Sequence, residues 1–179
     1  KALADGMIGK LQSLHQERLN LGKARDVENA AWSLGVHDVA VALYLFGEAP
    51  TASTMSGKAT FTAGVEDDTY IHMTFGRGAV AHIHSSWLWP ELRRRLTLIG
   101  DKGMLVFDEP SKQVVLYKKS IDDKLNNVDE GQEVVYEGAA QPLTLELEHF
   151  IECAQSGKTP DSDGQSGVDV LKVLAGASK

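Results

Sequence analysis

The chain has 179 residues, of which 42% are hydrophobic and 24% are charged, and its formal net charge at pH 7 is -7. These values are typical of a single domain that is large enough to bury a core. The negative charge argues against nucleic acid or an anionic membrane surface as a partner, because both require a basic patch. No apolar run is long enough to cross a bilayer, so no membrane partner is expected either.

The cysteine content bears on the cellular compartment of the protein, and the first residue bears on whether the sequence is a fragment. Cys153 is the single cysteine, which excludes an internal disulfide and fits a reducing compartment, so we expect a cytoplasmic protein. The chain opens on Lys1, with neither an initiator methionine nor a signal-peptide pattern. We therefore expect a fragment of a longer protein.

The N-terminal part leads from a short helical turn into a strand. Residues 1–6 resemble the last turn of a helix, and residues 8–21 predict a strand. One face of this strand carries Leu11, Ser13, His15 and Glu17. Residues 22–28 form a polar connection, with Arg25 just ahead of the next element.

A helix predicted over residues 29–47 is the centre of the chain. Its apolar residues recur at spacings of four and three, which is typical of one buried stripe: Trp32, Val36, Val39, Leu43 and Phe46. Gly47 favours a left-handed cap and Pro50 blocks continuation. Either Asp26 or Asn29 could cap the start.

A polar row accompanies that stripe. Asn29, Ser33 and His37 are each four residues apart, so they stack on one flank of the predicted helix. An amide, a hydroxyl and an imidazole in line can bind or protonate a polar ligand. The alternative is three ordinary half-buried polar groups.

After Pro50 the hydrophobic period changes from 3.6 to 2, which predicts strands joined by turns. The predicted strands are 52–62, 69–75, 79–88, 92–99, 103–108, 113–118 and a short edge strand, 133–137. The polar residues 121–132 are expected to form a mobile loop. Two helices finish the chain, one beginning at Pro142 and ending before Gly157.

Each of the last two helices is expected to bury an apolar face. The face of the first is Leu143, Leu147, Phe150, Ile151 and Ala154. The second runs from about residue 166, with Val170, Leu171 and Leu174 buried. The order of elements predicts an α+β domain with a mostly antiparallel, open-faced sheet and helices packed on one face. The other face would be open to solvent or a partner.

The sheet residues allow two further hypotheses. If residues 76–78 form a three-residue turn, His72 faces His82 with His84 on the same face, and the three could hold zinc or be surface polar groups. A two-residue turn would send His72 to the other face. Trp87 and Trp89 lie close in sequence to a run of three arginines. One interpretation is a buried core tryptophan with a partner at its rim, and the other is a surface that contacts a sugar or another subunit.

No motif for a nucleotide or a metal is present in the sequence. There is no glycine-rich phosphate loop, no paired-cysteine motif and no His-Glu-x-x-His. The chain therefore has no nucleotide-binding fingerprint of its own, and we expect no metal site in it.

Three long stretches of the sequence resemble a known family. They are NLGKARDVENAAWSLGVHDVAVALYLFG, SSWLWPELRRRLTLIGDKGMLVFDEP and PLTLELEHFIECAQSGKTPDSDGQSGVDVLKVL. In this order they resemble the C-terminal domain of the Gfo/Idh/MocA oxidoreductases, relatives of glucose–fructose oxidoreductase and inositol dehydrogenase. The nearest branch looks like the dehydrogenases of nucleotide-linked amino-sugar acids.

The resemblance implies that residues 1–179 are a C-terminal substrate-binding and oligomerisation domain. In the family, an N-terminal Rossmann domain, absent from this chain, binds NAD or NADP and carries a catalytic lysine. The C-terminal domain binds a sugar or nucleotide-sugar whose CH–OH group is oxidised, and its open sheet commonly mediates homo-oligomerisation. The isolated chain is then expected to be inactive.

The resemblance also assigns roles to residues of the central helix. His37 matches the family histidine that faces the sugar and is expected to be catalytic. The family has an aspartate four residues earlier, where this chain has Ser33, which offers only neutral hydrogen bonds. Asn29, Trp32 and Ser33 are expected to bind the substrate, and Arg25 to meet a carboxylate or phosphate. The alternative is a non-catalytic dimerisation or binding domain that uses its open sheet face.

Overall fold

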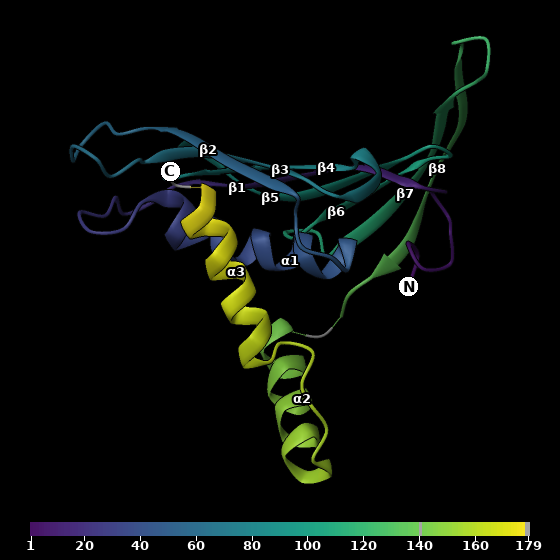
Figure 1. The fold of residues 1–179 in the computed structure, drawn as a ribbon. Coiled ribbons are helices and arrows are strands. Elements are labelled where there is room, and N and C mark those ends of the chain that lie inside the picture. The colour runs from purple at the N-terminus through teal and green to yellow at the C-terminus, as the bar shows by residue number, and fades with distance from the viewer. Residues whose placement is uncertain (140, 178–179) are drawn as a thin grey trace.

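The computed structural model describes residues 1–139 and 141–177, which fold into one sheet and three α-helices (Figure 1). The strands are β1 (Leu11–Leu21), β2 (Ala52–Lys58), β3 (Asp68–Thr74), β4 (Val80–Ser86), β5 (Leu88–Gly100), β6 (Met104–Asp108), β7 (Gln113–Ile121) and β8 (Asn127–Glu137). The helices are α1 (Val36–Phe46), α2 (Pro142–Ser156) and α3 (Gly164–Ala177). A π-helical turn, Ala31–Gly35, directly precedes α1. No helix in the described part of the chain is long and apolar enough to span a membrane.

The eight strands form a single sheet in the order β2-β3-β4-β1-β5-β6-β7-β8. Neighbouring strands pair antiparallel except β1 and β4, which pair in parallel. The α-helices lie on one side of the sheet, and among the described residues the other side carries no α-helix (Figure 1). The predicted α+β fold with a mostly antiparallel, open-faced sheet is therefore confirmed.

The core lies between α1 and the central strands. Leu14 of β1, Ile71 of β3 and Ile83 of β4 are each at most 1% exposed, and they pack in one cluster with Val39 of α1. Near the end of α1, the ring of Phe46 stacks on that of Phe75 with centroids 3.9 Å apart. Burial of this apolar surface is the main force that holds α1 to the sheet.

The central helix forms as predicted, and Val36, Val39, Leu43 and Phe46 of the predicted stripe lie in the core or pack against it, but Trp32 does not. The buried positions are Ala31, Gly35, Asp38, Val39 and Ala42, whereas Trp32 is 36% exposed. A π-helical turn holds more residues per turn than an α-helix, so it rotates the preceding residues relative to the face that 3.6 residues per turn predicts. Gly47 adopts the predicted left-handed cap, with φ of 67°.

The β7–β8 hairpin is longer than predicted, because residues expected to form a mobile loop belong to it. Cross-strand ion pairs join Lys119 to Asp129 at 2.8 Å and Lys118 to Glu133 at 3.1 Å. At the tip, the Asp122 carboxylate accepts hydrogen bonds from the amides of Lys124 and Asn126. Charged pairs across two strands, of which Lys119 and Asp129 are direct register partners, stabilise a polar hairpin that a hydrophobic pattern does not reveal.

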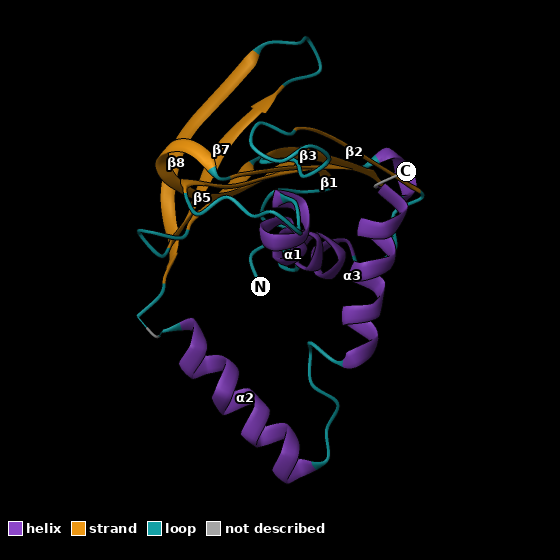
Figure 2. Cartoon of the chain, turned by 90° about the vertical axis from the view of Figure 1, so that its left-hand side faces the viewer, coloured by secondary structure: helices purple, strands orange, loops and turns teal. Residues whose placement is uncertain are grey.

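The two C-terminal helices form where predicted, but their apolar faces are not all buried. Val170 and Leu174 of α3 lie in the core, whereas Leu171 is 49% exposed. On α2, the predicted face is exposed throughout its length: Leu143, Leu147, Phe150, Ile151 and Ala154. In Figures 1 and 2, α2 projects away from the sheet. The expectation that this face packs against the rest of the domain is wrong.

Candidate functional site

Asn29 organises the start of the central helix. Its Oδ1 accepts a hydrogen bond from the Trp32 amide at 3.1 Å, which satisfies one of the free N–H groups at the helix start. Its Nδ2 donates to Glu66 Oε2 at 2.8 Å. The carboxamide thus ties the helix start to the segment ahead of β3, and both of its ends are engaged.

An open cavity of about 360 Å³ lies at this helix start. It is lined by Val27, Glu28, Asn29, Trp32 and Gly64. Two of the predicted substrate-binding residues, Asn29 and Trp32, therefore meet in one concave site. Gly64 is a contribution that the sequence did not suggest, because it comes from a turn more than thirty residues away along the chain.

The other three predicted site residues do not line this cavity. Arg25 is about half exposed and lies 3.7 Å from Glu28, one of the lining residues. Ser33 is half-buried, and its amide donates to the Asn29 carbonyl at 3.0 Å. His37 is exposed on α1. The imidazole of His37 is therefore accessible to a ligand, but it lies one turn beyond the cavity-lining residues.

Next to His37, Asp38 points into the protein and anchors α1 to β1. The residue is 3% exposed, and its carboxylate accepts hydrogen bonds from Arg18 Nε at 3.1 Å, Arg18 Nη2 at 3.1 Å and Gln16 Nε2 at 3.0 Å. Burial raises the pKa of the Asp38 carboxyl above its ordinary value, while the Arg18 guanidinium opposes that rise. Gln16 and Arg18 are two residues apart and therefore lie on the same, helix-covered face of β1. Two polar residues on the covered face of a strand are the sequence signal from which this contact could have been predicted.

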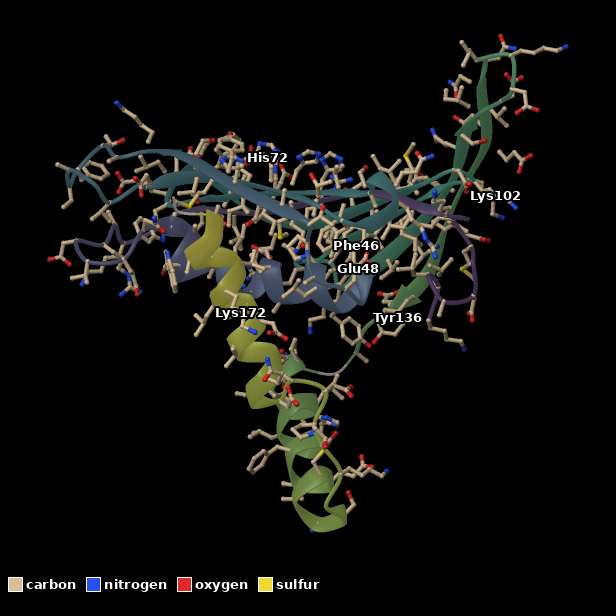
Figure 3. All side chains as sticks on the ribbon, viewed as in Figure 1. Phe46, Glu48, His72, Lys102, Tyr136 and Lys172 are labelled. Carbon is tan, nitrogen blue, oxygen red and sulfur yellow. The ribbon has the colours of Figure 1, made fainter. Side chains whose placement is uncertain are left out.

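The open face of the sheet carries a row of imidazoles. His72 of β3 pairs directly with His82 of β4, and their Nδ1 atoms are 2.6 Å apart. His15 of β1 completes the row, with its ring centroid 4.9 Å from that of His82. Figure 3 shows His72 on the side of the sheet away from the helices. The three-residue turn and the facing of His72 and His82 are therefore confirmed.

His84 belongs to a neighbouring aromatic group rather than to that row. Its ring stacks on Tyr70 with centroids 4.1 Å apart and meets the edge of Trp89 at 5.3 Å. Its Nε2 lies 2.9 Å from an Asp68 carboxylate oxygen. Trp87 is buried in the core, whereas Trp89 is half-buried beside Arg93. Across the described residues, no group of three or more His, Cys, Asp or Glu side chains is arranged to hold a metal ion.

Residues 1–106 match the family profile described as the GFO/IDH/MocA C-terminal domain. The chain belongs to the GFO/IDH/MocA family. This match includes the cavity, α1 and most of the sheet, so the family resemblance of the sequence is confirmed. None of the curated protein sequences matches the chain.

Solved structures share the fold of this GFO/IDH/MocA domain. UDP-N-acetylglucosamine 3-dehydrogenase GnnA from Acidithiobacillus ferrooxidans is 24% identical, with a TM-score of 0.80 over 97% of this chain and 54% of that one. Aldose-aldose oxidoreductase from Caulobacter crescentus is 21% identical, with a TM-score of 0.75 over 97% and 54%. An NAD binding oxidoreductase from Klebsiella pneumoniae is 17% identical, with a TM-score of 0.78 over 98% and 58%. The chain thus spans a little over half the length of these proteins.

The anchor of α1 in this GFO/IDH/MocA domain can be tested through its pH dependence. Because the pKa of Asp38 is raised on folding, its contribution to the free energy of unfolding is fully present below the ordinary aspartate pKa of about 3.9 and is lost as pH rises through the folded value. The stability of the unaltered chain relative to Asp38→Asn should therefore fall with rising pH, by up to about 1.4 kcal/mol per pH unit within that window.

The measurement is urea denaturation of both proteins at intervals between pH 4 and pH 7. Tyr44→Phe, at an exposed position of α1, is the control, and it should leave the pH dependence unchanged. A stability difference between the unaltered chain and Asp38→Asn that stays constant over this range would contradict the prediction.

Proposed function

We propose that this chain is the substrate-binding domain of an NAD(P)-dependent oxidoreductase that acts on a CH–OH group of a sugar or nucleotide-sugar. The observation that carries the proposal is the family match over residues 1–106, which contains the cavity at the helix start and the accessible imidazole of His37. The sugar-directed names of two structural neighbours, UDP-N-acetylglucosamine 3-dehydrogenase and aldose-aldose oxidoreductase, support the substrate class.

The residues at the helix start suit a hydroxyl-rich ligand. The Trp32 ring is 36% exposed and offers an apolar surface to the face of a sugar ring. Glu28, at the cavity wall, can accept hydrogen bonds from hydroxyl groups, and Arg25 beside it can pair with a carboxylate or phosphate of the ligand. The Asn29 carboxamide, already bonded at both ends, holds the wall of the cavity in place.

Oxidation of a CH–OH group removes a proton from the oxygen and a hydride from the carbon. In this proposal the residues of this chain accept the proton, and the hydride goes to the nicotinamide. His37 is the proposed acid/base group, because an accessible imidazole can accept a hydroxyl proton near neutral pH. Ser33, where family members have an aspartate, would orient a hydroxyl by neutral hydrogen bonds. The chain has no glycine-rich phosphate loop, so NAD or NADP would be held by a Rossmann domain outside these residues.

The catalytic proposal predicts different results for the chain and for the complete product of its gene. The 179-residue chain mixed with NAD(P)+ and nucleotide-sugars should give no change in nicotinamide absorbance, whereas the complete protein should turn over one of them. In the complete protein, His37→Ala should lower kcat/KM by about 10²–10⁴-fold, as loss of a general acid/base does.

Tyr44→Ala, at an exposed position of the same helix, is the control and should retain activity. A clear rate from the chain alone would contradict the assignment of the cofactor to another domain. An unchanged kcat/KM in His37→Ala would contradict the proposed acid/base role of His37.

A second function, self-association through the open sheet face, is favoured by the residues on that face. We propose that the complete protein forms a homo-oligomer there. No α-helix in the part of the chain that the structure describes covers this face (Figure 1), and it presents Tyr70, which is 44% exposed, beside the half-buried Trp89. Neutral imidazoles can donate and accept hydrogen bonds, so a face that carries them can pair with a second copy of itself.

The imidazole row predicts that this association depends on pH. Burial lowers the pKa of His82, and the neighbouring His15 and His72 lower it further. Association that buries the row favours a neutral His82 imidazole, so it should weaken as pH falls below the ordinary histidine pKa of about 6.5 and His82 gains its proton. Sedimentation velocity should show the dissociation constant rising at least about tenfold between pH 7.5 and pH 5.5.

The variant His72→Gln/His82→Gln should lose most of that pH dependence. His149→Gln, which changes an imidazole on α2, should keep it. Association that is unaffected by pH, or equally affected in the two variants, would contradict the role of the row.

A further inference from the structure

The loop between β2 and β3, residues 59–67, supplies one wall of the cavity at the helix start. Gly64 of this loop lines the cavity together with Asn29 and Trp32, and it adopts a left-handed conformation with φ of 80°. Residues 22–28, which lead toward that helix, lie at the same end of the sheet as the loop (Figure 1). Because glycine has no side chain, the loop backbone itself forms this wall, so the position of the wall depends on the conformation of the loop.

Asp67 holds this loop from the protein interior. The residue is 0% exposed, and its Oδ2 atom accepts hydrogen bonds from the amides of Thr60 at 2.7 Å and Phe61 at 3.3 Å. Its own backbone is fixed, because its amide donates to the Lys58 carbonyl at 2.9 Å and its carbonyl accepts from the Trp87 amide at 3.0 Å. The carboxylate therefore connects the ends of β2 and β4 to the first half of the loop.

Apolar packing contributes little to the conformation of the loop. Thr60, Ala63 and Gly64 are exposed, and Phe61 is 65% exposed. Hydrogen bonds from amides to a carboxylate are stronger than those to a neutral acceptor. The other carboxylate oxygen of Asp67, Oδ1, is buried and has no hydrogen-bond partner among the described residues, which costs free energy. A carboxylate here is therefore costly for stability, and what it provides is a strong acceptor for two loop amides.

Glu66, the residue before Asp67, ties the loop to the helix start. Its backbone carbonyl accepts a hydrogen bond from the Ala30 amide at 2.8 Å, and its Oε2 atom accepts one from Asn29 Nδ2 at 2.8 Å. Glu66 thus holds the helix start, and Asp67 holds the loop that carries Gly64. Loss of the Asp67 carboxylate would release the Gly64 wall and leave the contacts of Glu66 in place.

We propose that Asp67 is a positioning residue for the sugar substrate, an inference that rests on the proposed function. It acts through the loop, by fixing the Gly64 backbone at the distance from the Trp32 ring that a sugar requires. Backbone N–H and C=O groups form strong hydrogen bonds, so a wall made of backbone suits a ligand rich in hydroxyls, while the Trp32 ring meets its apolar face. His37 lies one turn beyond the lining residues, so Asp67 should affect the binding of the sugar and not the transfer of its proton.

Steady-state kinetics of the complete protein, with a sugar or nucleotide-sugar that it oxidises, test this role. Asp67→Ala should raise the KM for the sugar by about tenfold or more, with little change in kcat or in the KM for NAD(P)+. Asp67→Asn keeps an oxygen that can accept from the two loop amides, so its KM should stay within about threefold of that of the unaltered protein. Thr60→Pro removes the amide of the shorter hydrogen bond at an exposed position, and it should raise the same KM even if Asp67→Ala does not fold.

Thr69→Val is the matched control. Thr69 lies on β3, directly after the loop, and is 1% exposed, and its Oγ1 atom donates to the Ser85 carbonyl at 3.2 Å. The variant loses a buried hydrogen bond without a change to the loop, so it should lower the melting temperature and leave the KM for the sugar unchanged. If Asp67→Ala also lowers the melting temperature with no change in that KM, Asp67 serves stability alone and the inference is overturned.

Hydrogen–deuterium exchange separates this inference from the proposed function, because it needs no turnover. In the complete protein without added sugar or cofactor, Asp67→Ala should speed the exchange of the amides of residues 60–65 by about fivefold or more, and Thr69→Val should not. Unchanged exchange of the loop in Asp67→Ala would overturn the inference and leave the proposed function standing. A complete protein that oxidises no sugar would overturn the proposed function and, with it, the substrate role of Asp67.

Discussion

The contact on which the rest of the site depends is the buried pair between Asp38 of α1 and Arg18 of β1. The guanidinium makes two hydrogen bonds of 3.1 Å to the carboxylate, whose side chain is only 5% exposed. Apolar packing holds α1 against the sheet but has no direction of its own, whereas a bidentate ion pair fixes the rotation of the helix about its axis. Removal of the Arg18 guanidinium would leave the buried Asp38 carboxylate with the neutral Gln16 amide in place of a cation, at a cost of about 3–5 kcal/mol.

That fixed rotation explains why adjacent residues have opposite environments. Neighbouring residues of an α-helix are about 100° apart around its axis, so with Asp38 turned toward the sheet the His37 side chain leaves the covered face and is exposed. Gly35, one turn earlier, lies over β4, where a Cβ atom would come within 3.2 Å of Ser85 Oγ. The absence of a side chain there lets the helix approach the sheet closely enough for Asp38 to reach Arg18.

The sequence predicts most of the elements because each has a local cause. Gly47 and Gly157 end helices through left-handed caps, with φ of 67° and 71°, and hydrophobic alternation marks most of the strands. The exposure of Trp32 is different, because a π-helical turn has no hydrophobic signature and changes which of its residues face the core. The length of β8 likewise depends on Lys119 and Asp129 meeting across two strands, which only the folded register reveals.

The candidate site shows the same division between local and distant causes. The spacing of Asn29, Ser33 and His37 identifies the correct helix, yet the cavity at its start also requires Gly64, and the Asn29 carboxamide is bonded to Glu66. Those partners come from the turn between β2 and β3, so no reading of the helix alone could show that Asn29 is already engaged. The exposed apolar face of α2 is the converse case. Its pattern was visible in the sequence, but burial was expected within the chain, since a hydrophobic period reports that a face needs a partner and not where that partner is. The two exposed surfaces therefore differ in kind: the face of α2 is apolar at every pH, whereas the imidazole row on the sheet contains His82, whose pKa is lowered by burial and by the neighbouring imidazoles.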